Sequence, residues 1–242
     1  MQDYLQGILI ALKGAPVTLS VSAVAVIAGL VLGLVVAICK QSKFKVLRGI
    51  ATVYVDVLRG TPLLVQVLIL AYGVPQIVSA LFDIQFNWGN FIWVGFIACG
   101  INSSAYMAEI IRSGLQAIDK GQTEAARSLG MSSFQTMRYI IIPQAFKIIV
   151  PAMGNEFITL IKETSILSVV GIRDITRMGT LWASQSFLSF QAYIGVAVVY
   201  LFMTLTLSRV RNHRRRRPAD GAVRREGLSG TRGNPGRGSG CV

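Results

Sequence analysis

Long apolar runs alternate with short polar segments along most of the chain. Five runs have roughly the 20 residues that an α-helix needs to cross the hydrocarbon core of a bilayer, and they cover residues 17–38, 62–82, 91–111, 151–171 and 190–208. The first, second and fifth runs contain no charged residue. The pattern predicts an all-α membrane protein with five transmembrane helices.

Composition agrees with this class and excludes several others. Hydrophobic residues make up 52% of the chain and charged residues 14%, whereas soluble domains carry about 25% charged residues. The cysteines Cys39, Cys99 and Cys241 are far apart, and the single histidine, His213, lies in a basic segment. We therefore expect no disulfide framework, no metal site and no histidine-based catalytic triad. The N-terminus lacks a basic region and a cleavage site, so we expect no signal peptide.

Basic residues are distributed unevenly around the five runs, and this predicts the orientation. Alternation of the runs places three basic groups on one side: those between the first and second runs, those between the third and fourth, and those after residue 208. The opposite side has Lys13, Arg173 and Arg177. Because cytoplasmic loops carry the excess of positive charge, the sequence predicts an N-terminus outside and a C-terminus inside.

Helical spacing of apolar residues also occurs outside the five runs. Residues 1–16 predict an external amphipathic segment. Residues 46–58 predict a second amphipathic helix, which lies on the cytoplasmic surface and leads into the second run. Gly29 and Gly33 form a GxxxG pattern in the first run, and we expect this pattern to pack closely against a neighbouring helix.

The segment between the third and fourth runs is too polar to span a membrane and too regular to be a random linker. Asp119 can cap a short helix, and Gly130 occupies a position at which a helix commonly stops. A second short helix is expected to begin at Ser132 or Ser133 and to end before Pro143. Two short helices joined by a tight turn would form a compact knob at the membrane face.

This segment resembles the EAA loop of ABC importer permeases. The resemblance rests on Glu124, Ala125 and Ala126, with Gly130 four residues later and Pro143 at the end of the motif. Isoleucine precedes the proline here, where the family usually has leucine. The two alanines would make one face of the knob small enough to enter a groove on a partner.

Further motifs are similar to the polar amino-acid subfamily of these permeases, which includes histidine, glutamine and arginine permeases. They are Arg59-Gly60-Thr61-Pro62, Asn102-Ser103-Ser104-Ala105-Tyr106, Gly154-Asn155-Glu156-Phe157 and Lys162-Glu163-Thr164-Ser165. The resemblance covers about residues 10–210. It implies a five-helix, N-out permease of the bacterial cytoplasmic (inner) membrane, with coupling helices between the third and fourth transmembrane helices.

The resemblance also implies the partners. In that family the EAA loop docks on a cytoplasmic ABC ATPase, two permease chains pair above an ATPase dimer, and an extracytoplasmic solute-binding protein delivers the amino acid. The implied docking residues are Glu124, Ala125, Ala126, Gly130 and Pro143. The ATPase binds ATP and Mg²⁺, whereas this chain has no GxxxxGK[ST] motif. We expect it to be a non-catalytic subunit that binds no cofactor and no nucleic acid.

Polar residues inside the predicted spans mark a candidate substrate pathway. A charge at mid-membrane costs about 2.5–3.5 kcal/mol on insertion scales, so it requires a partner or a water-filled cavity. The candidates are Asn102, Ser103, Asn155, Glu156, Lys162 and Glu163. The fourth run offers both signs of charge, as the ammonium and carboxylate of an amino acid require. The alternative is an internal ion-pair network. Glu109 lies three residues before Arg112, a spacing that favours an ion pair.

The predicted domain organisation has three parts. Residues 1–16 form the external segment, residues 17–210 form the five-helix permease domain with its coupling loop at about 119–143, and residues 211–242 form a basic tail. The tail is rich in Arg and Gly and poor in large apolar residues, so we expect it to be disordered and to meet anionic lipid.

Two other functions compete with the importer. An ion-gradient-driven secondary amino-acid transporter would use Glu156 or Glu163 as its coupling carboxylate, although five spans without an internal repeat are few for that class. A membrane scaffold would explain the basic tail but not the third and fourth runs. The transported amino acid and the choice between homodimer and heterodimer stay open at this level.

Overall fold

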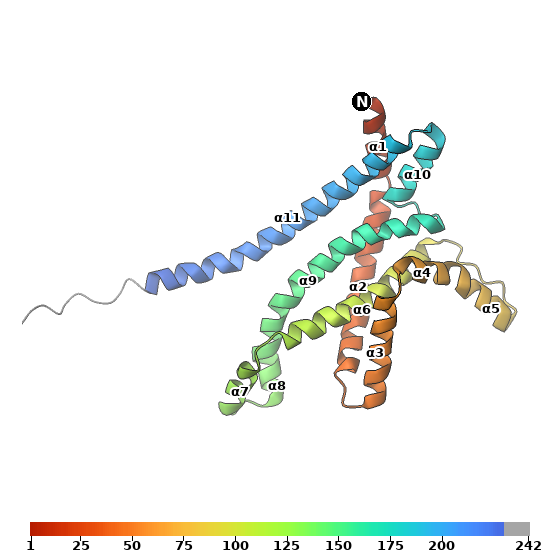
Figure 1. Cartoon of the computed structure of the whole chain (residues 1–242). Helices are drawn as coiled ribbons and strands as arrows, with labels where there is room; N and C mark the ends of the chain where they lie inside the picture. The colour runs from red at the N-terminus through yellow and green to blue at the C-terminus, as the bar shows by residue number, and fades with distance from the viewer. Residues whose placement is uncertain (230–242) are drawn as a thin grey trace, which may run out of the picture.

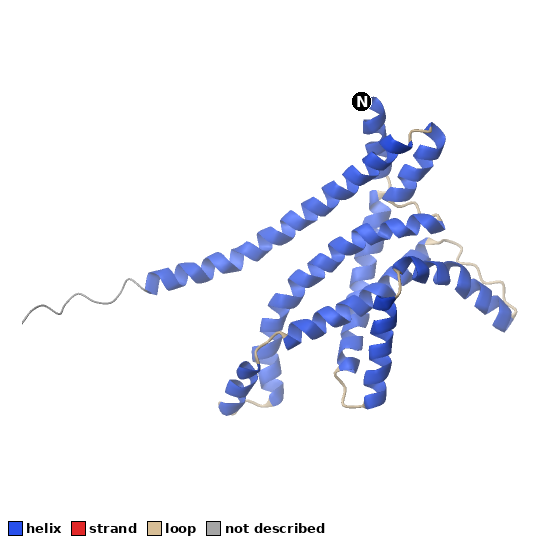
Figure 2. Ribbon diagram, viewed as in Figure 1, coloured by secondary structure: helices blue, strands red, loops and turns tan. Residues whose placement is uncertain are grey.

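The computed structural model describes the backbone of residues 1–229 and the side chains of residues 1–211, and within that part it is all-helical (Figure 2). Its elements are α1 (Gln2–Leu12), α2 (Ala15–Lys40), α3 (Lys45–Gly60), α4 (Leu63–Leu68), the π-helix η1 (Ile69–Gly73), α5 (Val74–Phe82), α6 (Ile92–Gln116), α7 (Lys120–Ser128), α8 (Ser133–Thr136), the π-helix η2 (Met137–Ile141), α9 (Ile142–Glu163), the 3-10 helix η3 (Thr164–Val170), α10 (Ile175–Ser186) and α11 (Ser189–Ser229).

Four stretches of the described residues are long and apolar enough to cross a membrane, judged by length and composition. They are Gln2–Lys40, Leu63–Phe82, Ile92–Gln116 and Ser189–Arg211, and they correspond to the first, second, third and fifth predicted spans. The fourth predicted span corresponds to the end of α9 together with η3, where the charged residues Glu156, Lys162 and Glu163 lower the apolar character. At the N-terminus α1 leads directly into α2, so the amphipathic segment and the first span form one stretch.

Helix α9 differs from the prediction at both ends. The second helix of the knob was predicted to end before Pro143, which is wrong, because the chain continues from α8 through η2 into α9 without a break. Pro143 lies in the first turn of α9, where a missing N–H is tolerated. Pro151, the expected start of the fourth span, is inside α9, and the α-helix ends at Glu163 before η3.

The amphipathic helix predicted at residues 46–58 forms as α3, but it does not lie apart on a surface. It runs back alongside the end of α2 and contacts α6 (Figure 1). Val55 of α3 is fully buried in a cluster with Ala37 of α2 and with Ala105 and Ala108 of α6. Burial of this narrow apolar stripe is the reason that α3 stands against the bundle.

Helices α2 and α6 pack closely, and the glycines predicted to allow this are at the contact. A Cβ placed on Gly29 would lie 2.7 Å from Ser103 Oγ, and one on Gly33 would lie 2.7 Å from Met107 Cβ. Both distances are shorter than real Cβ contacts allow. The prediction that the GxxxG pattern serves helix packing is therefore confirmed.

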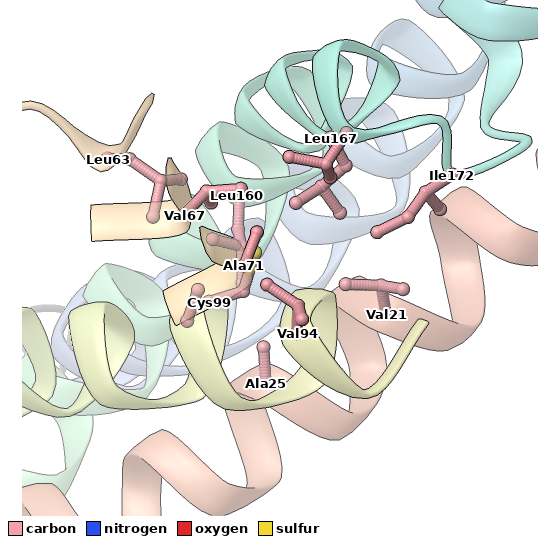
Figure 3. Packing of buried hydrophobic residues seen from close by; sticks show 12 residues of the cluster. Val21, Ala25, Leu63, Val67, Ala71, Val94, Cys99, Leu160, Leu167 and Ile172 are labelled. Atoms are coloured by element: carbon pink, nitrogen blue, oxygen red, sulfur yellow. The ribbon is translucent and has the colours of Figure 1, made fainter. Parts of the chain in front are cut away.

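A hydrophobic cluster joins α2, α4, α6 and the end of α9 (Figure 3). Figure 3 shows Val21 of α2 beside Val94 of α6 and Ala25 of α2 beneath it, with Leu160 and Leu167 reaching in from the other side. A second cluster connects α1, α10 and α11. Helix α5, the last part of the broken helix α4–η1–α5, projects away from these clusters, and none of its residues is buried (Figure 1).

The C-terminal helix α11 extends past the predicted fifth span. Its backbone remains helical to Ser229, so part of the tail predicted to be disordered continues the helix instead. Alanine and arginine, which recur in this stretch, are good helix formers. The side chains after Arg211, and residues 230–242 altogether, lie outside the described residues.

Candidate functional site

The two short helices between α6 and α9 form the knob that the sequence predicted, at one end of the molecule (Figure 1). Asp119 caps α7, because its side chain accepts a hydrogen bond from the Gly121 N–H at 2.7 Å. Gly130 follows the end of α7 with a φ of 81°, a left-handed conformation that favours glycine. The predicted cap and stop of this helix are both confirmed.

Hydrogen bonds hold the knob together. Ser132 and Gln135 form a reciprocal capping box at the start of α8. Arg127 Nη1 of α7 donates to Ser133 Oγ at 2.8 Å, and Gln144 Nε2 of α9 donates to Gln122 Oε1 at 3.2 Å. The knob is therefore connected to the beginning of α9, and a force on α7 can reach that helix.

The two alanines of the EAA motif face different ways. Ala126 is buried inside the knob, whereas Glu124 and Ala125 are exposed. The expectation that both alanines form the outward face is wrong, because adjacent residues of a helix are about 100° apart. The outward surface includes large apolar side chains instead: Leu129 is 84% exposed and Phe134 is 71% exposed.

Three cationic side chains surround Glu109 of α6 in the same half of the molecule. Arg112 donates to Glu109 Oε2 from Nε at 3.0 Å and from Nη2 at 2.7 Å, which confirms the predicted pair. Lys40 from the end of α2 donates to Oε1, and Arg59 Nη1 from the end of α3 lies 4.0 Å from Oε2. Arg59 also stacks over the Tyr106 ring at 5.3 Å. The carboxylate thus connects α2, α3 and α6.

The candidates on α6 point toward different neighbours. Asn102 is buried and donates to Gln66 Oε1 of α4 at 3.1 Å. Gln66 in turn donates to the Leu58 and Thr61 carbonyls at 2.9 and 3.2 Å, at the point where α3 ends and the chain turns into α4. Ser103 is fully buried and faces Gly29 of α2. Both side chains therefore contribute to helix contacts within this chain.

The candidates on α9 occupy one side of a continuous helix. Asn155 and Lys162 are exposed, and Glu156 and Glu163 are half-buried. Asn155 Oδ1 accepts a hydrogen bond from Arg211 Nη1 of α11 at 2.7 Å. Among the described side chains, none of the three charged candidates lies within 4.0 Å of an opposite charge, since the ion pairs found there all involve Glu109.

The structure therefore brings some candidates together and separates others. Glu124, Ala125, Ala126 and Gly130 share the knob, and Pro143 begins the helix behind it. Asn155 and Glu156 lie about two turns from Lys162 and Glu163 along α9. Sequence reasoning did not identify Lys40 or Arg211 as partners, because both contact residues more than 50 positions away.

No group of three or more His, Cys, Asp or Glu residues that could hold a metal ion occurs within the part of the chain that the structure describes. The candidate residues described above offer hydrogen bonds and charge, as binding and docking require.

Comparison with known proteins places these features in a family. Residues 29–217 match the family described as "Binding-protein-dependent transport system inner membrane component". The chain is 40% identical over 197 residues to the arginine transport system permease protein ArtQ of Bacillus subtilis (strain 168), covering 81% of this chain and 87% of that protein. It is 40% identical over 201 residues to a putative glutamine transport system permease protein GlnP of Rickettsia typhi, covering 83% and 89%.

Solved structures agree. An amino acid ABC transporter crystallised with histidines has a chain 45% identical to this one, with a TM-score of 0.79 over 86% of this chain and 94% of that chain. A chain of the MetNI methionine ABC transporter in an inward-facing conformation shares the fold at 17% identity, with a TM-score of 0.64 over 85% and 94%. The helical architecture is therefore the ABC permease fold, in a multi-pass inner-membrane protein. The chain belongs to the family of binding-protein-dependent transport system inner membrane components.

Proposed function

We propose that this chain is the transmembrane permease subunit of an ATP-driven importer for polar amino acids. The observation that carries the proposal is the knob formed by α7 and α8, which presents Glu124, Ala125 and the exposed Leu129 at one end of the bundle. The printed names of the similar proteins refer to arginine, glutamine and amino acid transport.

We infer that the chain crosses the membrane five times, with the N-terminus outside. The fourth of these crossings requires α9 and η3 to span the bilayer despite their charges. Half-burial of Glu156 and Glu163 supports this, because charged residues in membrane helices face a protein interior or a water-filled cavity. Two crossings, those of the second and third spans, separate the α2–α3 turn from the knob, so the basic residues of the turn and the knob lie on one side.

The proposed partners are a cytoplasmic ABC ATPase dimer, a second permease chain and an extracytoplasmic solute-binding protein. ATP and Mg²⁺ would bind to the ATPase, and this chain would catalyse no reaction. Closure of the ATPase dimer would move the two knobs together. Because Gln122 of the knob is hydrogen-bonded to Gln144 of α9, that motion would tilt α9 and change which side of the membrane its polar residues face.

The proposed substrate pathway passes along α9. Glu156, Lys162 and Glu163 have no opposite charge within 4.0 Å among the described side chains, so their charges are available to an ammonium and a carboxylate. Asn102, Ser103 and Asn155 are also proposed as pathway residues, and two of them, Asn102 and Asn155, already have partners within the chain. For these three, helix positioning is the alternative role.

The experiment that tests the docking role is co-purification of an ATPase from native membranes with Gly130→Asp beside the wild type. Gly89→Asp is the matched control, because Gly89 also has a positive φ, 64°, and no atom within 4 Å of an added Cβ. We expect the wild type and Gly89→Asp to retain the ATPase and Gly130→Asp to lose it. If the wild type is folded and no ATPase co-purifies with it, the proposed importer function is contradicted.

The alternative function, a gradient-driven transporter, is distinguished from the importer by its energy source. Uptake that requires ATP and survives an ionophore is expected for the importer. Uptake that an ionophore abolishes while ATP is maintained would favour Glu156 or Glu163 as a coupling carboxylate instead.

A further inference from the structure

A hollow lies at the turn between α2 and α3, away from the knob and from the charged side of α9. It has a volume of about 370 Å³ and is lined by Ile38 and Cys39 of α2, by Gln41 and Ser42 of the turn, and by Leu47 of α3. The lining is apolar where the two helices form the wall and polar where the turn closes it. Nothing in the proposed transport cycle uses this hollow.

Four basic residues lie within nine positions at this turn, and they are not equivalent. Lys40 is turned inward and hydrogen-bonds to Glu109 of α6, with 12% of its side chain exposed. Lys43, Lys45 and Arg48 are exposed, and in the described part of the chain no carboxylate lies within 4.0 Å of any of them. Each of these three positive charges lies within two positions of a residue that lines the hollow, and residues 40–55 contain no acid to offset them.

Exposed apolar side chains continue from the hollow along α3. Phe44 is 75% exposed and Val46 is 76% exposed, and Ile50 is also exposed. In a membrane protein such a surface contacts acyl chains, while basic residues at its edge meet the headgroup region. The combination of an apolar wall, a polar turn and a cationic edge has the chemistry of an anionic phospholipid, not that of a free anion.

We propose that the α2–α3 turn binds the headgroup of one anionic phospholipid. Lys43 and Arg48 bind its phosphate and negatively charged headgroup. The part of its acyl chains nearest the headgroup occupies the hollow between Ile38 and Leu47. Because Lys40 joins the same turn to Glu109, the bound lipid stabilises the α2–α3 hairpin against α6. The site depends on the membrane location of the chain and is independent of what is transported.

Native mass spectrometry of the full-length protein in detergent tests this, with phosphatidylglycerol and phosphatidylcholine as probes. We expect the wild type to retain phosphatidylglycerol selectively. Lys43→Gln with Arg48→Gln should weaken this binding about thirtyfold, since each basic residue near a membrane surface contributes about 1 kcal/mol. Lys13→Gln with Arg173→Gln removes two exposed charges elsewhere and should leave it unchanged. Equal loss in both double variants would overturn a specific site.

Leu47→Trp separates the hollow from general charge attraction. It keeps all four basic residues and fills the space, and Leu47 is exposed enough for a larger side chain to be accommodated. We expect retention of phosphatidylglycerol to fall at least tenfold while the thermal midpoint of unfolding stays within the range of the wild type. Unchanged retention would show that only diffuse charge attracts lipid. Displacement of the lipid by millimolar inorganic phosphate would likewise overturn the lipid assignment.

Discussion

The indole Nε1 of Trp88 donates a hydrogen bond to the carbonyl oxygen of Leu70 at 2.9 Å. Leu70 lies in the π-helix η1, where the N–H of residue 74 bonds to the carbonyl of Ile69 five positions earlier. The next bond in this pattern would come from residue 75, but that residue is Pro75 and has no N–H. Trp88, from the loop before α6, therefore supplies the donor that the proline cannot.

Trp88→Phe should destabilise the protein by about 1–3 kcal/mol, because it leaves the partly buried Leu70 carbonyl without its donor. Pro75→Ala restores an N–H at the position that π-helical bonding requires, so the cost of Trp88→Phe should be smaller in the Pro75→Ala background. Denaturant unfolding of the four proteins in detergent gives this comparison as a double-mutant cycle. Additive effects of the two changes would mean that Pro75 and Trp88 do not share the Leu70 carbonyl.

Gly33→Ala should weaken the contact of α2 with α6 by about 1–3 kcal/mol through overpacking. The added Cβ would lie 2.7 Å from Met107 Cβ and 2.8 Å from the Ser104 carbonyl oxygen, and the latter is backbone that cannot rotate away. Gly49→Ala is the control, because a Cβ there has no atom within 4 Å and alanine is about 1 kcal/mol better than glycine inside a helix. We expect Gly33→Ala to lower the thermal midpoint of unfolding and Gly49→Ala to keep or raise it.

Asp174 makes stability depend on pH. It is fully buried at the start of α10 and accepts hydrogen bonds from the Arg177 N–H at 2.9 Å, the Thr176 N–H at 3.1 Å and the Tyr200 hydroxyl at 3.1 Å. Burial raises the pKa of this carboxyl above its ordinary value of 3.8, and the hydrogen bonds to it only partly oppose that shift. The folded protein therefore retains a proton that the unfolded chain releases, and stability falls as pH rises from 3.8 through the raised pKa.

Asp174→Asn should remove this pH dependence, since the asparagine oxygen still caps α10 but does not titrate. The thermal midpoint of the wild type should decline with rising pH relative to that of the variant, with the largest difference above the raised pKa. Unfolding followed in detergent between pH 4 and pH 8 measures it. Parallel curves for the two proteins would contradict a titrating Asp174.

Glu156→Gln should reduce uptake of radiolabelled arginine or glutamine about tenfold or more, because a hydrogen bond to a charged group contributes about 1.5–3 kcal/mol. ATPase co-purification should be unaffected, since Glu156 is in α9 and not in the knob. Asp56→Asn is the control, as Asp56 is an exposed carboxylate on α3. Uptake by Glu156→Gln equal to that of the control would exclude the proposed role of this carboxylate.

Local patterns accounted for much of the fold. Capping at Asp119, the stop at Gly130, the close contact at Gly29 and Gly33, and the Glu109–Arg112 pair were all predicted correctly, because each depends on residues within a few positions or on a missing side chain. The end of the second knob helix was predicted wrongly at Pro143. A proline that stops one helix and a proline that begins the next have the same local sequence signal.

Local sequence patterns did not predict the contacts between helices that are far apart in the sequence. Lys40 and Glu109 are 69 positions apart, and Asn155 and Arg211 are 56 apart. Burial of Ala126 rather than Ala125 likewise depends on how α7 rotates against its neighbours. The spacing of residues along the sequence does not predict these contacts, because they form only when two particular helix faces pack against each other.

The sequence by itself determined that the chain is helical and membrane-bound, where its apolar stretches lie and where the knob is placed. These follow from transfer free energies and helix capping, which act over short stretches. Only the tertiary structure decided that α3 stands against α2 and α6, that Glu109 gathers cations from three helices, and that Trp88 completes the π-helix broken by Pro75. Those outcomes depend on which helix faces pack together, and packing is a property of the whole chain.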